Sequence, residues 1–420
     1  MRLFLYNLIL KLVSPAVRFW LRRHALYGPL IGRFQPQVPP STAGAIWVHV
    51  CSLGEANGAQ PLVTALRKAF PALPWLVTTS TLSGRVHCEA LYGPEHVAWF
   101  PVDTKPAVRH FLAAAAPRIL ILFETELWPN VLHECATRQI PVLLANGRLS
   151  DKHLHRYRRY RWWYGPLIQS LEGACMQDEL FKERLMDLGV PSERITITGS
   201  VKFDAVRDSV PARERSRMRQ EWGFREGQAI LLFACTRPGD EALASACWAT
   251  LKEENPRLKL LIAPRHLDRI EEVIEPFSEP VIRRTQLRDR NRPEGARVFV
   301  LDTLGELGTL YALASVVVVG GSFYPGVNGH NPLEAAALGV PTVFGPYMSN
   351  FSQAEKVLVT AGGAIQVACP EDLYLALSTL LTDSGKQRQM GTAARRAVMA
   401  NRGAVAKTIG QVRVLLGDEL

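Results

Sequence analysis

Four charged side chains in the first half of the chain follow segments that we predict to be buried strands. Glu55 follows the first of these strands, Glu124 and Glu126 follow the fourth, and Lys202 follows the seventh. Ligands of open α/β sheets bind outside the carboxyl ends of the strands, so these side chains stand where a substrate is expected. Glu55 could act there as a general base on a hydroxyl. Lys202 could stabilise developing negative charge.

Each of these residues also has an ordinary structural interpretation. Glu55 comes after Ser-Leu-Gly, so it could simply be an acidic residue in the first turn of a helix, where the helix dipole favours it. Glu124 and Glu126 could lie in a solvated turn, although their apolar neighbours argue against this. Otherwise one of them, beside Trp128, suits a carboxylate with a shifted pKa or a hydrogen-bonding anchor. Lys202 could be solvated like most lysines. Position in the sequence does not choose between these readings.

The second half of the chain repeats this pattern with residues suited to an anion. Arg265 follows a predicted strand in the sequence APRH, and its guanidinium could bind a phosphate or a carboxylate through two hydrogen bonds. Gly305 and Glu306 follow another strand, in DTLGEL, and begin a helix that could contact an anion or a ribose.

Residues 316–346 contain the clearest single pattern. Four valines predict a buried parallel strand, and a glycine-rich loop then leads to Asn331-Pro332-Leu333-Glu334. Asn at the N-cap, Pro at the first helical position and Glu three residues after the cap are typical of a helix start. Its unpaired N–H groups could bind a nucleotide phosphate. An ordinary crossover in which Glu334 only caps its helix is an equally good reading of this stretch.

The composition describes a folded protein with an anionic partner. The chain has 420 residues, 47% of them hydrophobic, and a net charge of +10. This charge suits a nucleic acid, an acidic membrane or a phosphorylated substrate. The seven cysteines are scattered and form no C-x-x-C motif, so we expect reduced residues of a cytoplasmic protein and no metal site.

Residues 1–20 are strongly apolar but carry a polar stripe at helical spacing, formed by Asn7, Lys11, Ser14 and Arg18. We therefore expect a helix that lies in the membrane surface, with its basic residues toward the lipid headgroups. A single-span anchor and a helix packed on its own domain are the alternatives, although Lys11 and Pro15 are unusual for a clean span.

Residues 151–164, DKHLHRYRRYRWWY, interleave basic and aromatic side chains. Such a segment could stack on single-stranded nucleic acid or lie at a lipid interface. Because the apolar N-terminal segment is in the same chain, we favour the membrane surface and expect no nucleic-acid partner.

Strands and helices alternate from residue 46 onward, which predicts two doubly wound parallel-sheet domains facing a cleft. We expect a membrane-associating helix in 1–32, domains at 45–206 and 227–400, and a final helix at 401–420 that crosses back to the first domain. Residues 33–44 are predicted to be a Pro-rich linker, and the charged residues 207–226 the domain boundary. The predicted strands are 46–51, 75–79, 97–100, 119–123, 142–145, 174–176, 195–198, 230–234, 259–263, 298–301, 316–319, 342–344 and 364–367.

Six motifs occur in one order across residues 48–346: VHVCSLGE, FETELWPN, GSVKFD, APRH, DTLGELGTLY and GGSFYPGVNGHNPLEAAALGVPTVFGP. Together they resemble the Kdo transferases of Gram-negative lipid A biosynthesis, glycosyltransferases of the GT-B fold. The resemblance implies transfer of 3-deoxy-D-manno-octulosonic acid (Kdo) from CMP-Kdo to a lipid A precursor, lipid IVA, with inversion. It also implies the cytoplasmic face of the bacterial inner membrane and no cofactor or metal.

The resemblance also assigns roles to residues. By this resemblance Glu55 matches the catalytic base, and Glu126 and Lys202 match groups that support the transition state. The residues that match the CMP-Kdo site are Pro264, Arg265, Gly305, Glu306, Leu307, Asn331, Pro332, Leu333 and Glu334. A soluble nucleotide-sugar epimerase of the same fold and a basic nucleic-acid-binding module are the alternative functions.

Overall fold

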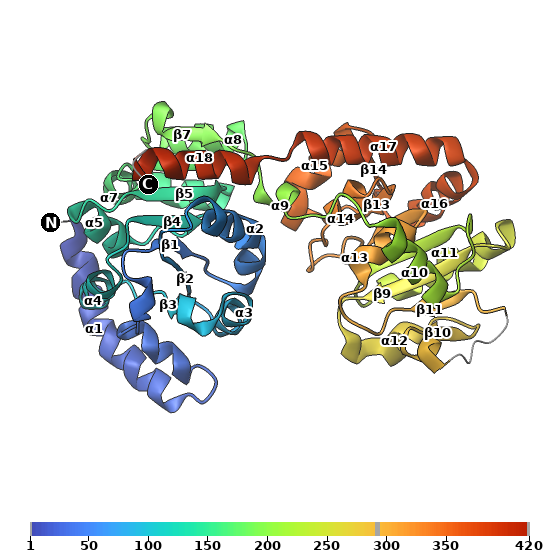
Figure 1. Cartoon of the computed structure of the whole chain (residues 1–420), viewed down its shortest axis with the longest axis horizontal. Helices are drawn as coiled ribbons and strands as arrows, with labels where there is room; N and C mark the ends of the chain where they lie inside the picture. The colour runs from blue at the N-terminus through green and yellow to red at the C-terminus, as the bar shows by residue number, and fades with distance from the viewer. Residues whose placement is uncertain (1, 290–294, 418–420) are drawn as a thin grey trace. The chain divides into compact units, whose positions relative to one another are not determined.

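The computed structural model describes residues 2–289 and 295–417 (Figure 1). Contacts divide the chain into two compact units. The first contains the residues up to Ala205 together with those from Arg402 onward, and the second contains Val206–Asn401. Of the segments predicted from the sequence, Met1 and residues 418–420 of the terminal helix lie outside the described residues.

The first unit is built on a seven-stranded parallel sheet in the order β3-β2-β1-β4-β5-β6-β7. Parallel strands are covered on both faces, which is why their sequences are nearly continuous apolar runs; all five residues of β4 are buried. The strands are β1 (Ile46–His49), β2 (Trp75–Thr79), β3 (Val97–Trp99), β4 (Ile119–Phe123), β5 (Val142–Gly147), β6 (Gly173–Met176) and β7 (Ile195–Ile197).

Helices cover both faces of this sheet. One apolar cluster joins the sheet to α4, α5, α6, α7 and α8, and a second joins the other face to α2, α3, α9 and α18. The helices are α1 (Arg2–Arg23), α2 (Leu53–Ala69), α3 (Leu82–Tyr92), α4 (Lys105–Ala115), α5 (Pro129–Thr137), α6 (Asp151–Arg159), α7 (Arg161–Ile168), α8 (Glu179–Asp187), α9 (Val201–Asp204) and α18 (Ala404–Leu416).

The second unit has its own seven-stranded parallel sheet, in the order β10-β11-β9-β8-β12-β13-β14. Its strands are β8 (Ile230–Thr236), β9 (Lys259–Pro264), β10 (Val281–Arg283), β11 (Val298–Val300), β12 (Val316–Val319), β13 (Thr342–Phe344) and β14 (Ala364–Gln366). Its helices are α10 (Ala212–Trp222), α11 (Asp240–Glu254), α12 (Ile270–Ile274), α13 (Leu307–Leu310), α14 (Leu333–Ala337), α15 (Ser352–Thr360), α16 (Leu373–Thr382) and α17 (Ser384–Ala400).

The prediction of two doubly wound parallel sheets is confirmed, and every predicted strand is present with ends within two residues. One strand, β10, was missed because three residues at a sheet edge carry almost no periodic signal. The helix after β1 begins at Leu53, so Glu55 lies in its first turn. Gly58 lies inside this helix against the ring of Phe123.

The segment predicted as a Pro-rich linker is folded against the first unit. It overlaps two 3₁₀ helices, η1 (Gly28–Phe34) and η2 (Pro40–Thr42). Arg33 in η1 donates from Nε to the carbonyl of Phe100 at 3.1 Å and from Nη1 to the carbonyl of Ser80 at 3.4 Å. These bonds hold η1 at the ends of β2 and β3.

The N-terminal helix α1 is attached to the first unit along one side. Tyr6 donates its hydroxyl hydrogen bond to Asp103 at 2.7 Å, and the amides of Asn7 and Asn130 pair at 2.8 and 3.1 Å. The opposite side is exposed and apolar, with Phe4 70% and Leu12 71% accessible. Its segment Leu3–Arg23 is also long and apolar enough to cross a membrane.

The last helix, α18, packs on α2 and α9 of the first unit. Asp204 fixes its start, because this carboxylate accepts hydrogen bonds from the backbone N–H groups of Gly403 at 2.8 Å and Val405 at 2.7 Å. Arg402 adds a bond from Nε to the carbonyl of Phe203 at 3.2 Å.

We predict that Asp204→Ala loosens α18, because two backbone donors lose a charged acceptor at a cost of about 1–2 kcal/mol. Amide hydrogen exchange in α18 should accelerate about tenfold. The control is Asp187→Ala, which removes only a surface ion pair with Arg158 and should change exchange in α18 little. Equal exchange in the two variants would contradict this role of Asp204.

Candidate active site

The switch point of the first sheet lies between β1 and β4, where the strand order reverses. Ligands of doubly wound sheets bind at the carboxyl ends of such strands. Glu55 follows β1, whereas Glu124 and Glu126 follow β4. The fold therefore brings carboxylates that are about 70 residues apart in sequence to the same place.

Glu55 lies in the first turn of α2 and takes part in its N-terminal cap. The hydroxyl of Ser52 accepts from the N–H of Glu55 at 3.4 Å, and Oε2 of Glu55 accepts from the N–H of Cys51 at 2.8 Å. This reciprocal pair resembles a capping box and fixes the rotamer of the carboxylate. Capping and chemistry are compatible, because the cap occupies one carboxylate oxygen and the side chain is half-buried.

The surroundings of Glu55 favour its protonated form. The pKa of Glu55 is raised to about 8, mainly by burial and in addition by the nearby carboxylates of Glu124 and Glu126. The Cys51 N–H and the Arg148 guanidinium act in the opposite direction. A carboxylate with a pKa near neutrality can both take and return a proton at working pH.

Glu126 and the thiol of Cys51 complete a cluster with Glu55. Ligand atoms of these three residues lie within 4.8 Å of one another. Burial raises the pKa of Glu126, while hydrogen bonds from Trp128 Nε1 (3.1 Å) and the Cys51 thiol, and the charge of Arg33, lower it. The spacing of the cluster would also suit a metal ion, although the sequence contained no familiar metal motif.

Lys202 lies near Glu124, which follows the same strand as Glu126. Glu124 has a left-handed backbone (φ 61°) at the end of β4, and its carboxylate pairs with Arg148 at 3.0 Å. Burial lowers the pKa of Lys202, and the charge of Glu124 opposes this shift. Asn146 in β5 positions the helix that carries Lys202, because its Oδ1 accepts from the N–H of Val201 at 3.1 Å.

The structure thus brings Glu55, Glu126 and Lys202 to one edge of the first sheet, as the strand-end argument predicts. It adds Arg33 and Arg148, which the sequence analysis missed. Arg148 directly follows β5 and could have been found by the same strand-end argument. Arg33 lies in the Pro-rich segment, where no pattern in the sequence indicates its position.

The second sheet has an equivalent switch point between β8 and β12. Asp240 joins the two loops there, since its carboxylate accepts from the N–H groups of Arg237 at 2.8 Å and Gly321 at 2.7 Å. Gly320 is required at this crossing, because a Cβ atom would lie 2.6 Å from the carbonyl oxygen of Cys235. Cys235 itself has a left-handed backbone, with φ 57°.

Arg265, Glu334 and His330 gather beside this crossing. Arg265 is exposed after β9, and its charge acts on both other groups. Burial raises the pKa of Glu334, opposed by Asn331 and Arg265. Burial and the charges of Arg237 and Arg265 lower the pKa of His330 to about 4, so His330 is neutral at pH 7.

The start of α14 differs by one residue from its prediction. The helix begins at Leu333 with Pro332 at the cap position, not with Asn331 there. Asn331 still caps it, since its Oδ1 accepts from the N–H of Leu333 at 3.1 Å, and its Nδ2 donates to Glu334 at 3.1 Å. Glu334 therefore bonds to a side chain and not to the backbone N–H of a capping box.

The other residues predicted for the nucleotide site mainly contact the protein itself. Pro264 ends β9 and Leu333 is fully buried. The carboxylate of Glu306 is held by Arg284 at 2.7–3.0 Å and by the hydroxyl of Thr303 at 2.6 Å. Gly305 has φ 86° with open space around its Cα, and Leu307 opens the short helix α13.

Tyr311 connects this segment to the switch point. It is buried directly after α13, and its hydroxyl hydrogen-bonds the thiol of Cys235. Cys235 in turn lies near enough to Glu334 and Arg265 for their charges to act on its pKa, which burial raises to about 11. Residues 305–311 therefore run toward the cluster that contains Arg265.

Comparisons with known proteins agree with this architecture. The family model of 3-deoxy-D-manno-octulosonic-acid transferase (kdotransferase) matches residues 20–205. A 3-deoxy-D-manno-octulosonic acid transferase of Bordetella pertussis is 32% identical over 98% of this chain and 99% of its own. One of Haemophilus influenzae is 29% identical over 97% of this chain and 94% of its own.

Solved structures show the same fold at low identity. A glycosyltransferase of Rickettsia africae has a TM-score of 0.58 at 12% identity, covering 90% of this chain and 100% of that one. The UDP-GlcNAc 2-epimerase of Neisseria meningitidis has a TM-score of 0.59 at 14% identity, covering 88% and 99%. The two Rossmann-like units thus form a GT-B fold, as predicted.

We predict that Glu124→Gln lowers the pKa of Glu55, because it removes a neighbouring negative charge and frees Arg148 from its ion pair. Carboxyl ¹³C titration of glutamate-labelled protein, with the Glu55 resonance assigned through Glu55→Gln, measures this value. Glu193→Gln, at an exposed position of the same unit, is the control and should leave it near 8. An unchanged midpoint in Glu124→Gln would show that Glu124 does not act on Glu55.

Proposed function

This chain belongs to the Kdo transferase family, and from that premise we propose that it transfers Kdo from CMP-Kdo to a lipid A precursor, lipid IVA, in lipopolysaccharide biosynthesis. The observation that carries the proposal is the half-buried carboxylate of Glu55 at the switch point of the first sheet, with a pKa raised to about 8. A glycosyl transfer to a hydroxyl needs such a proton acceptor.

In the proposed reaction an acceptor hydroxyl oxygen attacks the anomeric carbon of Kdo from the side opposite the phosphate. The new C–O bond forms as the bond from that carbon to the CMP phosphate breaks, which inverts the configuration. Glu55 takes the proton of the hydroxyl, and CMP leaves with the bonding electrons. No redox partner or cofactor is needed for this balance.

Glu126 and Lys202 are proposed to stabilise the transition state. Lys202, half-buried and close to Glu124, supplies positive charge in surroundings of low dielectric, where each charge acts more strongly than in water. Glu126, fixed by Trp128 and Cys51, supplies a hydrogen-bond acceptor next to Glu55. We keep the prediction that the reaction uses no metal. Its basis is that the donor carries one phosphate and not a diphosphate.

The second unit is proposed to bind CMP-Kdo. Arg265 is exposed and suits the phosphate or the sugar carboxylate, and Asn331 and Glu334 offer amide and carboxylate groups beside it. Pro264, Pro332 and Leu333 are proposed to shape this site by packing, and Gly305, Glu306 and Leu307 form another of its proposed loops. Glu306 would act by holding its loop to Arg284.

We further propose that the protein works at the cytoplasmic face of the bacterial inner membrane. The exposed apolar side of α1 supports attachment, while the Tyr6–Asp103 and Asn7–Asn130 contacts favour a helix lying in the interface over one that crosses the bilayer. A spanning helix would have to give up these contacts.

The test of the proposed function is Glu55→Gln, which keeps the shape of the side chain and removes the base. We expect CMP-Kdo binding to be retained and Kdo transfer to fall by about 10²–10⁴-fold. Transfer is measured by incubating the protein with CMP-Kdo and a lipid A precursor and weighing the lipid by mass spectrometry. Each added Kdo then appears as a discrete mass increase.

Two further variants make this test specific. Arg265→Ala should instead weaken donor binding, with the affinity for CMP-Kdo lowered about tenfold or more. Glu193→Gln should behave as the unaltered protein. Near-normal transfer by Glu55→Gln would remove Glu55 as the base, and absence of any transfer by the unaltered protein would reject the function.

A further inference from the structure

Asp103 is a buried carboxylate outside the proposed catalytic residues. It follows β3, is only 3% accessible, and forms hydrogen bonds to both α1 and α5. A carboxylate with so little access to water is costly to bury unless its oxygens accept several hydrogen bonds. The partners of these bonds therefore indicate what Asp103 does.

Asp103 caps the start of α5 from a distant part of the chain. Trp128 occupies the N-cap position, where its indole has no oxygen to accept a hydrogen bond, and Pro129 at the first helical position has no N–H. The next two N–H groups, those of Asn130 and Val131, both donate to the carboxylate of Asp103 at 3.0 Å. The side-chain amide of Asn130 also donates to the carbonyl oxygen of Asp103. Asp103 thus performs the role that a residue at the N-cap usually performs.

The start of α5 in turn determines where Glu126 lies. Trp128 is the last residue before α5, and its Nε1 donates to Oε2 of Glu126 at 3.1 Å. The Trp128 ring also lies beside Phe100, three residues before Asp103, with ring centroids 6.1 Å apart. A shift at the start of α5 would move this indole and the loop of residues 124–128, which we call the Glu126 loop. Small displacements of a group that supports a transition state lower the rate strongly.

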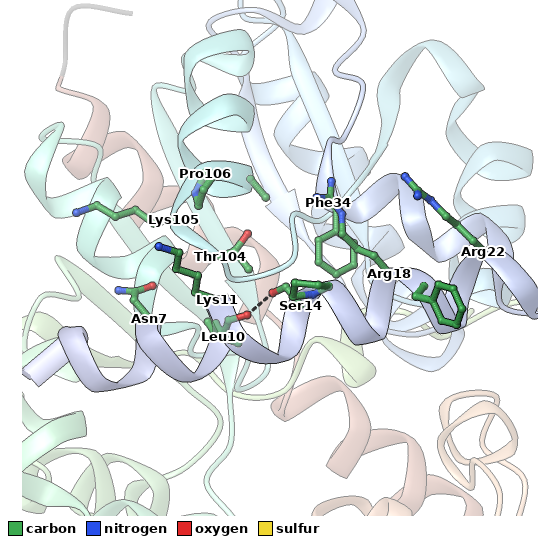
Figure 2. A pocket seen from close by; sticks show the side chains of 13 residues that line it. Asn7, Leu10, Lys11, Ser14, Arg18, Arg22, Phe34, Thr104, Lys105 and Pro106 are labelled. Carbon is green, nitrogen blue, oxygen red and sulfur yellow. Dashed lines mark hydrogen bonds between the residues drawn. The ribbon is translucent and has the colours of Figure 1, made fainter.

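The N-terminal helix α1 supplies further contacts to the same residues. The hydroxyl of Tyr6 donates to Oδ2 of Asp103 at 2.7 Å. Asn7 pairs with the side chain of Asn130, which is 1% accessible, through bonds of 2.8 and 3.1 Å. Asn7 also lines one groove together with Thr104, the residue after Asp103 (Figure 2). Helix α1 is therefore bonded both to the residue that caps α5 and to the first turn of α5.

These contacts are separate from the surface that suits a membrane. Attachment to a bilayer would depend on the apolar side of α1, where Phe4 and Leu12 are exposed. The polar contacts are on the opposite side and lead, through Asp103 and α5, to Trp128. Buried polar networks fix one arrangement of the groups that they join. The polar side of α1 can therefore act on the Glu126 loop independently of attachment.

We propose that Asp103 is a positioning residue and that α1, through Tyr6, helps it to hold the Glu126 loop in its active arrangement. The inference rests on the proposed function, in which Glu126 supports the transition state. It adds that α1 acts on the rate of Kdo transfer and not only on attachment. Tyr6 and Asp103 act through α5 and Trp128 and take no part in the chemical step.

The first test measures Kdo transfer by Tyr6→Phe, which removes one hydroxyl, and by Asp103→Asn, which places an amide donor among the N–H groups of α5. We expect kcat to fall about threefold to tenfold in Tyr6→Phe, because a buried hydrogen bond is lost, and about tenfold or more in Asp103→Asn. The KM values for CMP-Kdo and the lipid should change by less than about twofold, because neither variant alters a proposed substrate contact. Tyr6→Phe keeps the test valid if Asp103→Asn does not fold.

The control is Tyr27→Phe, the same substitution at an exposed position just after α1. It should leave kcat and both KM values unchanged. An unchanged kcat in Tyr6→Phe, or an equal fall in Tyr27→Phe, would overturn the proposal.

A double-mutant cycle tests whether Tyr6 acts through Glu126. If it does, Tyr6→Phe should lower kcat by less than about twofold when Glu126→Gln is already present, because the charge that Tyr6 helps to position is gone. A merely structural role of Tyr6 would lower kcat by the same factor in both backgrounds. That result would contradict the proposal.

One measurement separates this effect from attachment. Sedimentation with vesicles of phosphatidylcholine and phosphatidylglycerol in equal parts should give the same bound fraction for Tyr6→Phe and the unaltered protein, because the apolar side of α1 is unchanged. Vesicle binding that falls together with kcat would show that Tyr6 acts through attachment, and it would overturn the proposal.

A second measurement does not depend on turnover. In protein labelled with ¹⁵N-tryptophan, the indole resonance of Trp128, assigned through Trp128→Phe, should shift in Tyr6→Phe and stay in place in Tyr27→Phe. If the unaltered protein transfers no Kdo, the proposed function fails, and this resonance still reports whether α1 is coupled to Trp128. An unshifted Trp128 resonance in Tyr6→Phe would overturn the coupling itself.

Discussion

The proposed chemistry depends on the free energy of ionising one half-buried carboxylate among others. Glu55, Glu124 and Glu126 are brought together where β1 and β4 end. Burial raises the pKa of Glu55 most, and repulsion by the other two carboxylates adds to this effect. Because its pKa is raised from its ordinary value of 4.5 to about 8, ionising Glu55 destabilises the folded state as pH rises through that range. The left-handed backbone of Glu124 adds a cost of about 1 kcal/mol at the same place. Such costs are typical of sites retained for function.

The two sides of the N-terminal helix have different surroundings. Its polar side, which the sequence predicts from the spacing of Asn7, Lys11, Ser14 and Arg18, lines a groove with Thr104 and Lys105 (Figure 2) and bonds to Asn130 in α5. Its apolar side is exposed. The sequence left open whether this segment lies in the interface, spans the membrane or packs on its own domain. Long-range contacts, Tyr6 with Asp103 and Asn7 with Asn130, show that one side of the helix packs on its own domain, and these contacts cannot be derived from local periodicity. Its position in the membrane surface stays a proposal.

Much of the fold could be predicted from the sequence, because buried parallel strands are continuous apolar runs such as the four valines of β12. The strand-end argument also found Glu55, Glu126, Lys202 and Arg265. It could not find Arg33, which reaches the site from a Pro-rich segment. It also could not show that the carboxylate of Glu306 is bonded to Arg284, because both features depend on tertiary contacts. The edge strand β10 was missed because its three residues are too few to show a period.

The central claim is that Glu55 accepts the proton of the acceptor hydroxyl, and the pH dependence of Kdo transfer tests it most directly. The base form of a group with a pKa of about 8 increases tenfold per pH unit below that value. We therefore expect kcat/KM to rise with pH between about 6 and 8 and then to level off, and this rise should be absent from the residual activity of Glu55→Gln. A profile that is flat over this range, or a rise that persists in Glu55→Gln, would contradict the account.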